Sequence, residues 1–126
     1  MIVIYHNPES TGSNACLEIL ETHKNDSQVI KYQDKPLDKI KFTKIIKLLN
    51  IKPEELIRKE SKTWIDNFKP LVDEGHKFND DSLIDIMIEY QDIIERPIII
   101  NGEKAVIGDP PKRIFDIVQQ ENAPLK

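Results

Sequence analysis

The segment IVIYHNPESTGS, residues 2–13, decides how the fold begins. Its apolar beginning, residues 2–5, is rich in β-forming side chains and is typical of a buried strand. Pro8 ends this strand, because proline has no N–H group to donate to a sheet. Small polar residues at 10–13 then form a loop that opens a helix, and apolar side chains follow at helical spacing over residues 16–20. The segment therefore predicts a strand, a loop and a helix in direct succession.

A second short strand is expected over residues 28–32, which completes a β-α-β unit of roughly thirty residues, the usual length of a parallel crossover. Near the other end, apolar runs at 97–100 and 104–107 flank Asn101-Gly102, a pair that favours a hairpin turn. A last helix is expected to follow, with Asp109 as its cap ahead of two prolines. The order β-α-β and then β-β-α predicts an α/β fold with one mixed sheet.

The middle of the chain, from about residue 38 to about residue 94, carries helical signals. Asp38 is expected to cap one helix, and Pro53 to begin another, since proline suits the first helical position. Asn79 is expected to cap a further helix with apolar side chains facing inward. We interpret this region as a helical insert within a single domain of residues 1–126.

Composition limits the classes of function. The chain has 126 residues, of which 39% are hydrophobic and 32% charged, as in one ordinary globular domain. Its net charge of -4 argues against direct binding of nucleic acid, because phosphate affinity comes from clustered cations. Apolar runs of only a few residues predict no membrane span, and no secretory signal is recognised, so a cytoplasmic location is expected. One cysteine and three histidines, spread along the chain, show no metal-ligand spacing.

Three stretches occur in a characteristic order. They are IYHNPESTGS at residues 4–13, LIRK at 56–59, and a region from FNDDSLID at 78–85 through RPIII at 96–100 to Gly-Asp-Pro at 108–110. Together they resemble the arsenate reductase (ArsC) family of the glutaredoxin-dependent type and its relatives, the Spx-type regulators. The resemblance implies a thioredoxin-like fold with a helical insert. It also implies arsenate reduction with no bound cofactor, in which glutathione and glutaredoxin serve as the reductant.

The position that would carry catalysis departs from the family pattern. By resemblance, the nucleophilic cysteine follows Pro8 by two residues, and here that position is Ser10. A thiolate at a helix N-terminus is reactive near neutral pH, whereas a serine hydroxyl needs an adjacent general base. The Spx-type cysteine pair would fall on Ser10 and Ser13, so that redox switch is missing too. We therefore predict that thiol-dependent arsenate reduction is lost or altered.

The resemblance also implies a site for a small oxyanion such as arsenate, phosphate or sulfate. Arg58 and Arg96 occupy two of three arginine positions that hold the oxyanion, while Asp109 occupies the third and reverses its charge. Ordinary pairing of both arginines with neighbouring carboxylates is the alternative. Backbone N–H groups at a helix start could also bind the anion, or the hydroxyls there could merely cap the helix. The residues concerned are Ser10, Thr11, Gly12 and Ser13.

His6 and Pro97 are the expected supporting residues. Without a thiolate to tune, His6 is expected to form a hydrogen bond with the loop backbone. Pro97 is expected to follow a cis peptide bond, as the corresponding proline does in thioredoxin-like folds, and to pack near Ser10. Cys16 falls at apolar helical spacing and is interpreted as a buried, inert thiol.

These residues favour an oxyanion-binding or protein-docking role for the chain. The alternative is an active arsenate reductase that depends on glutathione and glutaredoxin. That alternative holds if Ser10 is an engineered replacement of cysteine, or if Cys16 takes over the role of the nucleophile.

Overall fold

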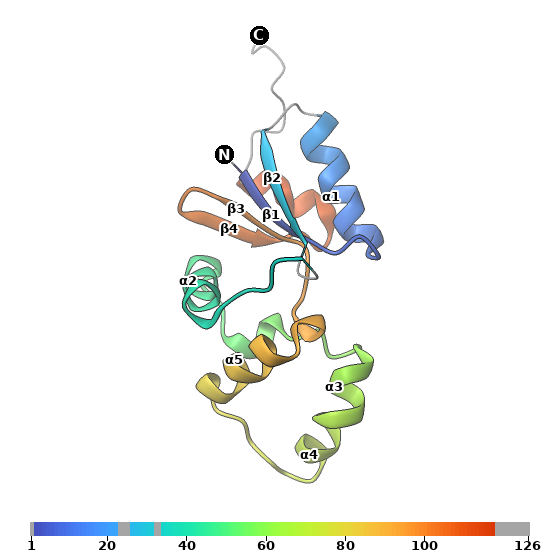
Figure 1. Cartoon of the computed structure of the whole chain (residues 1–126), viewed down its shortest axis with the longest axis vertical. Coiled ribbons are helices and arrows are strands. Elements are labelled where there is room, and N and C mark those ends of the chain that lie inside the picture. The colour runs from blue at the N-terminus through green and yellow to red at the C-terminus, as the bar shows by residue number, and fades with distance from the viewer. Residues whose placement is uncertain (1, 23–25, 32–33, 118–126) are drawn as a thin grey trace. The chain divides into compact units, whose positions relative to one another are not determined.

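A computed structural model describes residues 2–22, 26–31 and 34–117 (Figure 1). The chain divides into two compact units. The first contains Met1–Lys35 and Arg96–Lys126, and the second contains Pro36–Glu95. That the whole chain forms one domain stays a prediction.

The first unit is built on a mixed sheet, which within the described residues has four strands in the order β2-β1-β3-β4. The inner strand β1 is parallel to β2 and antiparallel to β3, and β3 forms an antiparallel hairpin with β4. The strands are β1 (Ile2–His6), β2 (Ser27–Lys31), β3 (Ile98–Asn101) and β4 (Lys104–Ile107). The predicted α/β class with a mixed sheet is confirmed. Tyr32, the expected end of the second strand, lies outside the described residues.

The turn of the β3–β4 hairpin lies one residue later than predicted. Asn101 pairs with Lys104, so the loop consists of Gly102 and Glu103. Gly102 has a φ of 65°, and positive φ at the first loop position alone is the pattern of a type II′ turn. Asn101 belongs to the strand instead, since it pairs with Ile2 and Lys104, and its side-chain amide donates a hydrogen bond to the carbonyl oxygen of Ile117 at 2.6 Å.

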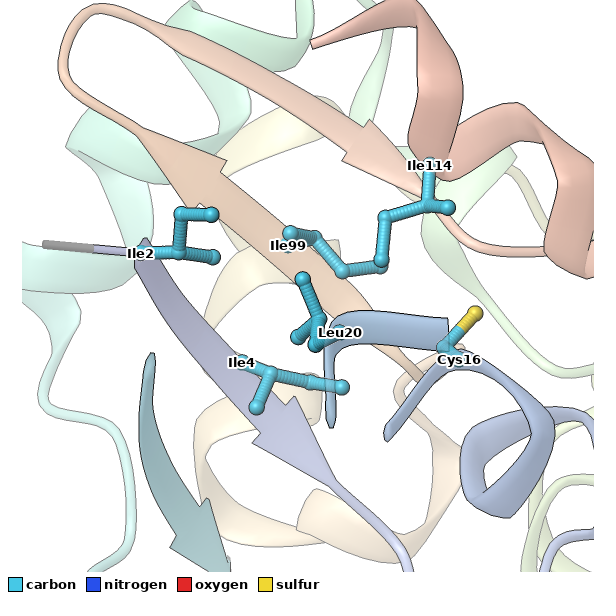
Figure 2. Packing of buried hydrophobic residues seen from close by; sticks show 6 residues of the cluster. All are labelled: Ile2, Ile4, Cys16, Leu20, Ile99 and Ile114. Atoms are coloured by element: carbon cyan, nitrogen blue, oxygen red, sulfur yellow. The ribbon is translucent and has the colours of Figure 1, made fainter. Parts of the chain in front are cut away.

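The core of the first unit lies between the sheet, the helix α1 (Thr11–Thr22) and the 3-10 helix η3 (Pro111–Asp116). Cys16 and Leu20 of α1 belong to one buried cluster with isoleucines of the strands, and Figure 2 shows Leu20 between Ile4 and Ile99. The side chains of Cys16 and Leu20 are one turn apart and neither has exposed surface. Burial of this apolar surface, at about 25 cal/mol per Å², is the main force that holds α1 on the sheet.

The end of the first unit differs from the sequence-based expectation. The last helix is a short 3-10 helix, and its N-cap is Pro110 rather than Asp109. Asp109 therefore lies one residue before the cap and cannot fill that role. The Asp109–Pro110 peptide bond is cis, which the sequence analysis did not predict.

The second unit is helical in its described residues. Its elements are α2 (Lys39–Leu49), η1 (Pro53–Leu56), α3 (Lys62–Asn67), α4 (Lys69–Asp73), α5 (Asp80–Glu89) and η2 (Gln91–Ile93). The predicted caps are confirmed: Asp38 Oδ1 accepts the backbone N–H of Lys41 at 2.7 Å, and Asn79 Oδ1 accepts that of Ser82 at 2.8 Å. These caps satisfy amides that have no acceptor inside the helix.

Candidate functional site

Ser10 begins α1 as its N-cap. Its hydroxyl oxygen accepts the backbone N–H of Ser13 at 3.1 Å, and its carbonyl oxygen accepts that of Asn14 at 3.0 Å. The bond from Asn14 is the first backbone hydrogen bond of the helix. The bond from Ser13 gives an acceptor to an amide that has none inside the helix. The interpretation of Ser10 as a helix cap is therefore confirmed, and its hydroxyl oxygen stabilises the start of α1.

Asn7 organises the loop between β1 and α1. Its carbonyl oxygen accepts the N–H of Ser10 at 3.0 Å, and its side-chain oxygen accepts the N–H of Glu9 at 3.0 Å. From the other side, the side-chain amide of Asn14 donates to the carbonyl oxygen of Pro8 at 3.0 Å. These bonds fix the path of the loop, so the helix start has a defined geometry.

His6 pairs with the side chain of Ser13 rather than with the loop backbone. His6 Nδ1 lies 2.9 Å from Ser13 Oγ, and both residues are buried. Ser13 Oγ also accepts the backbone N–H of Asn7 at 3.0 Å, which leaves its own proton to donate to a neutral imidazole. Burial, and then the positive charge of Lys31, lower the pKa of His6 below its usual 6.5. A neutral His6 that accepts from Ser13 fits both observations.

Among the described residues, no backbone acceptor contacts the amides of Thr11 and Gly12 at the start of α1. Helix geometry gives them no acceptor within the helix, while the N–H of Ser13 is taken by Ser10. Space beside Gly12 is open, since a Cβ added there would approach Ser10 Oγ at 3.8 Å and no other described atom within contact range. The first turn of α1 contains no acidic residue. This helix start can therefore donate two hydrogen bonds to an anion.

Pro97 follows a cis peptide bond, as predicted. Its side chain is fully buried, and its carbonyl oxygen accepts the N–H of Gly108 at 2.8 Å. Arg96, directly before it, belongs to the first unit and is 8% exposed. The expected packing of Pro97 near Ser10 stays a prediction.

Arg58 belongs to the second unit. Its backbone N–H donates to the carbonyl oxygen of Ile93 at 2.7 Å, and its side chain is 44% exposed. The Nε atom lies 3.5 Å from a carboxylate oxygen of Glu60, which is the ordinary pairing that the sequence analysis gave as the alternative. Convergence of Arg58 with Arg96 and Ser10 on one oxyanion stays a prediction, because these residues belong to different units.

Cys16 is a core residue. It has no exposed surface, and its Sγ lies 3.4 Å from the carbonyl oxygen of Gly108. Burial, and then the charge of Asp109, raise the pKa of the thiol to about 11. The expected burial of Cys16 is confirmed. Because the thiolate is the reactive form, the raised pKa favours an unreactive thiol near neutral pH. The influence of Asp109 on this thiol was not foreseen.

Over the described ranges, no helix combines the length and the apolar character that a bilayer crossing requires. Nor do those ranges contain a group of three or more His, Cys, Asp or Glu side chains placed to hold a metal ion.

A mixed α/β sheet, a helix that starts directly after the first strand and a cis proline before β3 define a thioredoxin-like protein. The model of the ArsC family matches residues 5–117. The chain therefore belongs to the ArsC family, as the sequence motifs had suggested.

Individual relatives agree with this assignment. The chain is 32% identical over 117 residues to an arsenate reductase of Acidiphilium multivorum, covering 93% of this chain and 80% of that protein. It is 30% identical over 118 residues to the uncharacterized protein YfgD of Escherichia coli, covering 93% of this chain and 96% of that protein. Among solved structures, an arsenate reductase from Vibrio cholerae superimposes with a TM-score of 0.83 at 29% identity, covering 93% of this chain and 97% of that one.

Proposed function

We propose that this arsenate reductase-like protein binds a small oxyanion, such as arsenate, phosphate or sulfate, without reducing it by thiol chemistry. The observation that carries the proposal is the hydroxyl group at position 10, which caps α1 where the family pattern has a reactive thiol. Relatives named arsenate reductases suggest the class of ligand.

Loss of the reaction follows from the chemistry of the available groups. A serine needs a general base to become a nucleophile, but the Nδ1 atom of His6 is bonded to Ser13 rather than to Ser10. An arsenate ester formed on Ser10 would also contain no sulfur for glutathione to attack. Cys16, the single cysteine of the chain, is buried with its pKa raised to about 11. No thiolate is therefore available near neutral pH.

Oxyanion binding is supported by the geometry of the same helix start. The amides of Thr11 and Gly12 lie at the positive end of a helix of 12 residues, and the space beside Gly12 is open. The cation of Arg96 belongs to the same unit. These groups provide donors and positive charge without any covalent step.

An arsenate reduction assay with glutathione and glutaredoxin tests the loss of catalysis. We expect no turnover by the unaltered protein and detectable turnover by Ser10→Cys. Thr11→Cys is the matched control, because it places an exposed thiol one residue away from the family position. Turnover by the unaltered chain would refute the proposal, and its disappearance in Cys16→Ala would identify Cys16 as the nucleophile.

Phosphate titration followed by calorimetry tests the binding. Thr11→Pro removes one of the two free amides yet suits the first helical position, whereas Thr11→Ala keeps the amide. A hydrogen bond to a charged group contributes roughly 1.5–3 kcal/mol, so Thr11→Pro should weaken binding by about tenfold or more. Equal affinity of the two variants would show that the start of α1 does not hold the anion.

A further inference from the structure

The second unit contains a pocket of about 500 Å³ that includes none of the residues discussed above as the candidate site. Sites for small organic molecules typically have roughly 300–1,000 Å³, an apolar lining and a few polar groups. This pocket has the appropriate size, and its lining contains both apolar side chains and charged groups.

The floor of the pocket is apolar and buried. Ile57, Trp64 and Leu83 line it, and each is 5% exposed. Phe78 adds an aromatic wall, with its ring centroid 6.4 Å from that of Trp64. Phe68 supports both rings, because it stacks on Trp64 at 5.4 Å and meets Phe78 edge-on at 6.2 Å. Such packing holds flat aromatic surfaces in fixed positions.

The backbone after α4 determines the shape of the opening. Gly75 has a φ of 97°, and its N–H donates to the carbonyl oxygen of Val72 at 2.9 Å. The N–H of His76 donates to the carbonyl oxygen of Leu71, also at 2.9 Å. These two bonds form a Schellman motif, which ends α4 and reverses the chain. His76 then contacts Phe78 edge-on at 4.4 Å, so the segment that borders the pocket has a defined conformation.

The charged side chains of the lining leave one cation available. Lys59 forms an ion pair with Glu54 at 2.9 Å, and Lys69 forms one with Asp73 at 2.8 Å. Lys77 also lines the pocket and forms no ion pair with any residue in the described ranges. Three lysines against two carboxylates give this lining a charge of +1 within a chain whose net charge is -4.

We propose that this pocket binds a small organic anion with an apolar, preferably aromatic, body and a single carboxylate. The apolar body lies against Trp64, Phe78 and Leu83, and the carboxylate faces Lys77. Both parts are needed, because an inorganic anion would leave the apolar floor in contact with water and a neutral hydrocarbon would leave Lys77 unused.

Trp64 is the single tryptophan of the chain, so its fluorescence reports directly on the pocket. The unaltered protein is titrated with phenylpropanoate and, in parallel, with phenylpropanol, its neutral counterpart. We expect a saturable change with the anion and a dissociation constant on the order of 1 mM or below, as for a good ligand of this size. The anion should bind about three- to fivefold more tightly than the alcohol, and added salt should remove this preference.

Two pairs of variants test where and how the probe binds. Lys77→Gln should abolish the preference for the anion without changing the affinity for the alcohol, while Lys104→Gln, an exposed lysine of β4, should change neither. Val72→Phe should fill the pocket and weaken both probes, whereas Ile65→Phe should not, although Val72 and Ile65 are equally exposed at 43%. The proposal is overturned if no saturable change occurs, if the preference survives Lys77→Gln, or if the two phenylalanine variants behave alike.

Discussion

Gly108→Ala should destabilise the first unit through a collision in its core. A Cβ added at Gly108 would lie 2.5 Å from Cys16 Sγ, 2.8 Å from Ile99 Cδ1 and 2.9 Å from Pro97 Cγ. Carbon and sulfur atoms normally approach no closer than about 3.5 Å, and all three neighbours are fully buried. Overpacking of a core costs about 1–3 kcal/mol, and three simultaneous contacts favour the upper part of that range.

The assay is urea unfolding followed by circular dichroism, with the slope m checked for constancy. A loss of about 2–3 kcal/mol corresponds to a fall in Tm of roughly 4 °C for each kcal/mol in a chain of this length. The closest contact is with the sulfur, so Cys16→Ala in the same molecule should relieve part of the strain. Alone, Cys16→Ala should cost about 0.5–1.5 kcal/mol, as the loss of one buried heavy atom does. The double variant should be more stable than the sum of the two losses predicts, by about 1 kcal/mol.

Gly12→Ala is the control, because a Cβ there would lie 3.8 Å from its nearest described neighbour, Ser10 Oγ. It should be neutral or stabilise slightly, since alanine is the better helix former. The reasoning is refuted if Gly108→Ala stays within about 0.5 kcal/mol of the unaltered protein, the ordinary scatter of harmless substitutions. Strict additivity with Cys16→Ala would refute the claim that the sulfur blocks the Cβ.

Three further predictions concern the candidate site. Ser10→Ala should lower the free energy of unfolding by about 1 kcal/mol in urea titrations, because α1 loses its cap. Burial and Lys31 lower the pKa of His6 below 6.5, so the unfolded chain binds the proton more tightly. The free energy of unfolding should therefore fall as the pH drops below 6.5, and this slope should be smaller in His6→Gln. Cys16 should resist thiol-specific reagents in the native protein at neutral pH and react at once in denaturant, since its pKa is about 11.

Local chemistry explains which parts of the fold could be predicted from the sequence. Asp38 and Asn79 were identified as caps because the capping bond joins residues three apart, and such bonds need no tertiary context. The strands could be recognised from short β-branched runs bounded by Pro8 and by Asn101-Gly102. The prediction of a cis bond before Pro97 depended on the family resemblance, because the local sequence pattern does not indicate it.

The errors arose where distant residues decide the outcome. The Asn-Gly pair predicts a turn at Asn101, but pairing with Ile2 on β1 and Lys104 on β4 makes this residue part of β3. Asp before a helix commonly predicts a cap, but the helix starts two residues after Asp109, at Pro111. The pair of His6 and Ser13 was also missed, since a strand end and the third helical residue meet only after the loop has closed.

The pocket of the second unit could not be predicted from the sequence either. Trp64 and Phe78 are separated by helices and by the turn at Gly75, and the sequence pattern shows their apolar character but not that they share one cavity. The sequence also could not show that Lys77 lacks an ion pair among the described residues, because several carboxylates occur within a few residues of it.

In the proposed function, a serine rather than a cysteine at position 10 also changes how the start of α1 interacts with an anion. A thiol at a helix N-terminus loses its proton readily, because the amide dipoles favour the thiolate. That local charge would occupy the positive end of α1 and repel an oxyanion. A neutral Ser10 hydroxyl accepts the N–H of Ser13 at 3.1 Å and leaves the amides of Thr11 and Gly12 for an external ligand.

The proposed oxyanion binding therefore depends on the absence of a negative charge at position 10, and this dependence can be tested. In phosphate titrations, Ser10→Cys should bind as the unaltered protein does at a pH where the thiol keeps its proton, and more weakly once the thiolate has formed. Two unit charges about 4 Å apart near a protein surface interact by about 4 kcal/mol, so even strong screening leaves a measurable difference. Parallel pH profiles for the two proteins would show that the anion binds elsewhere, because a charge at position 10 could not then be felt.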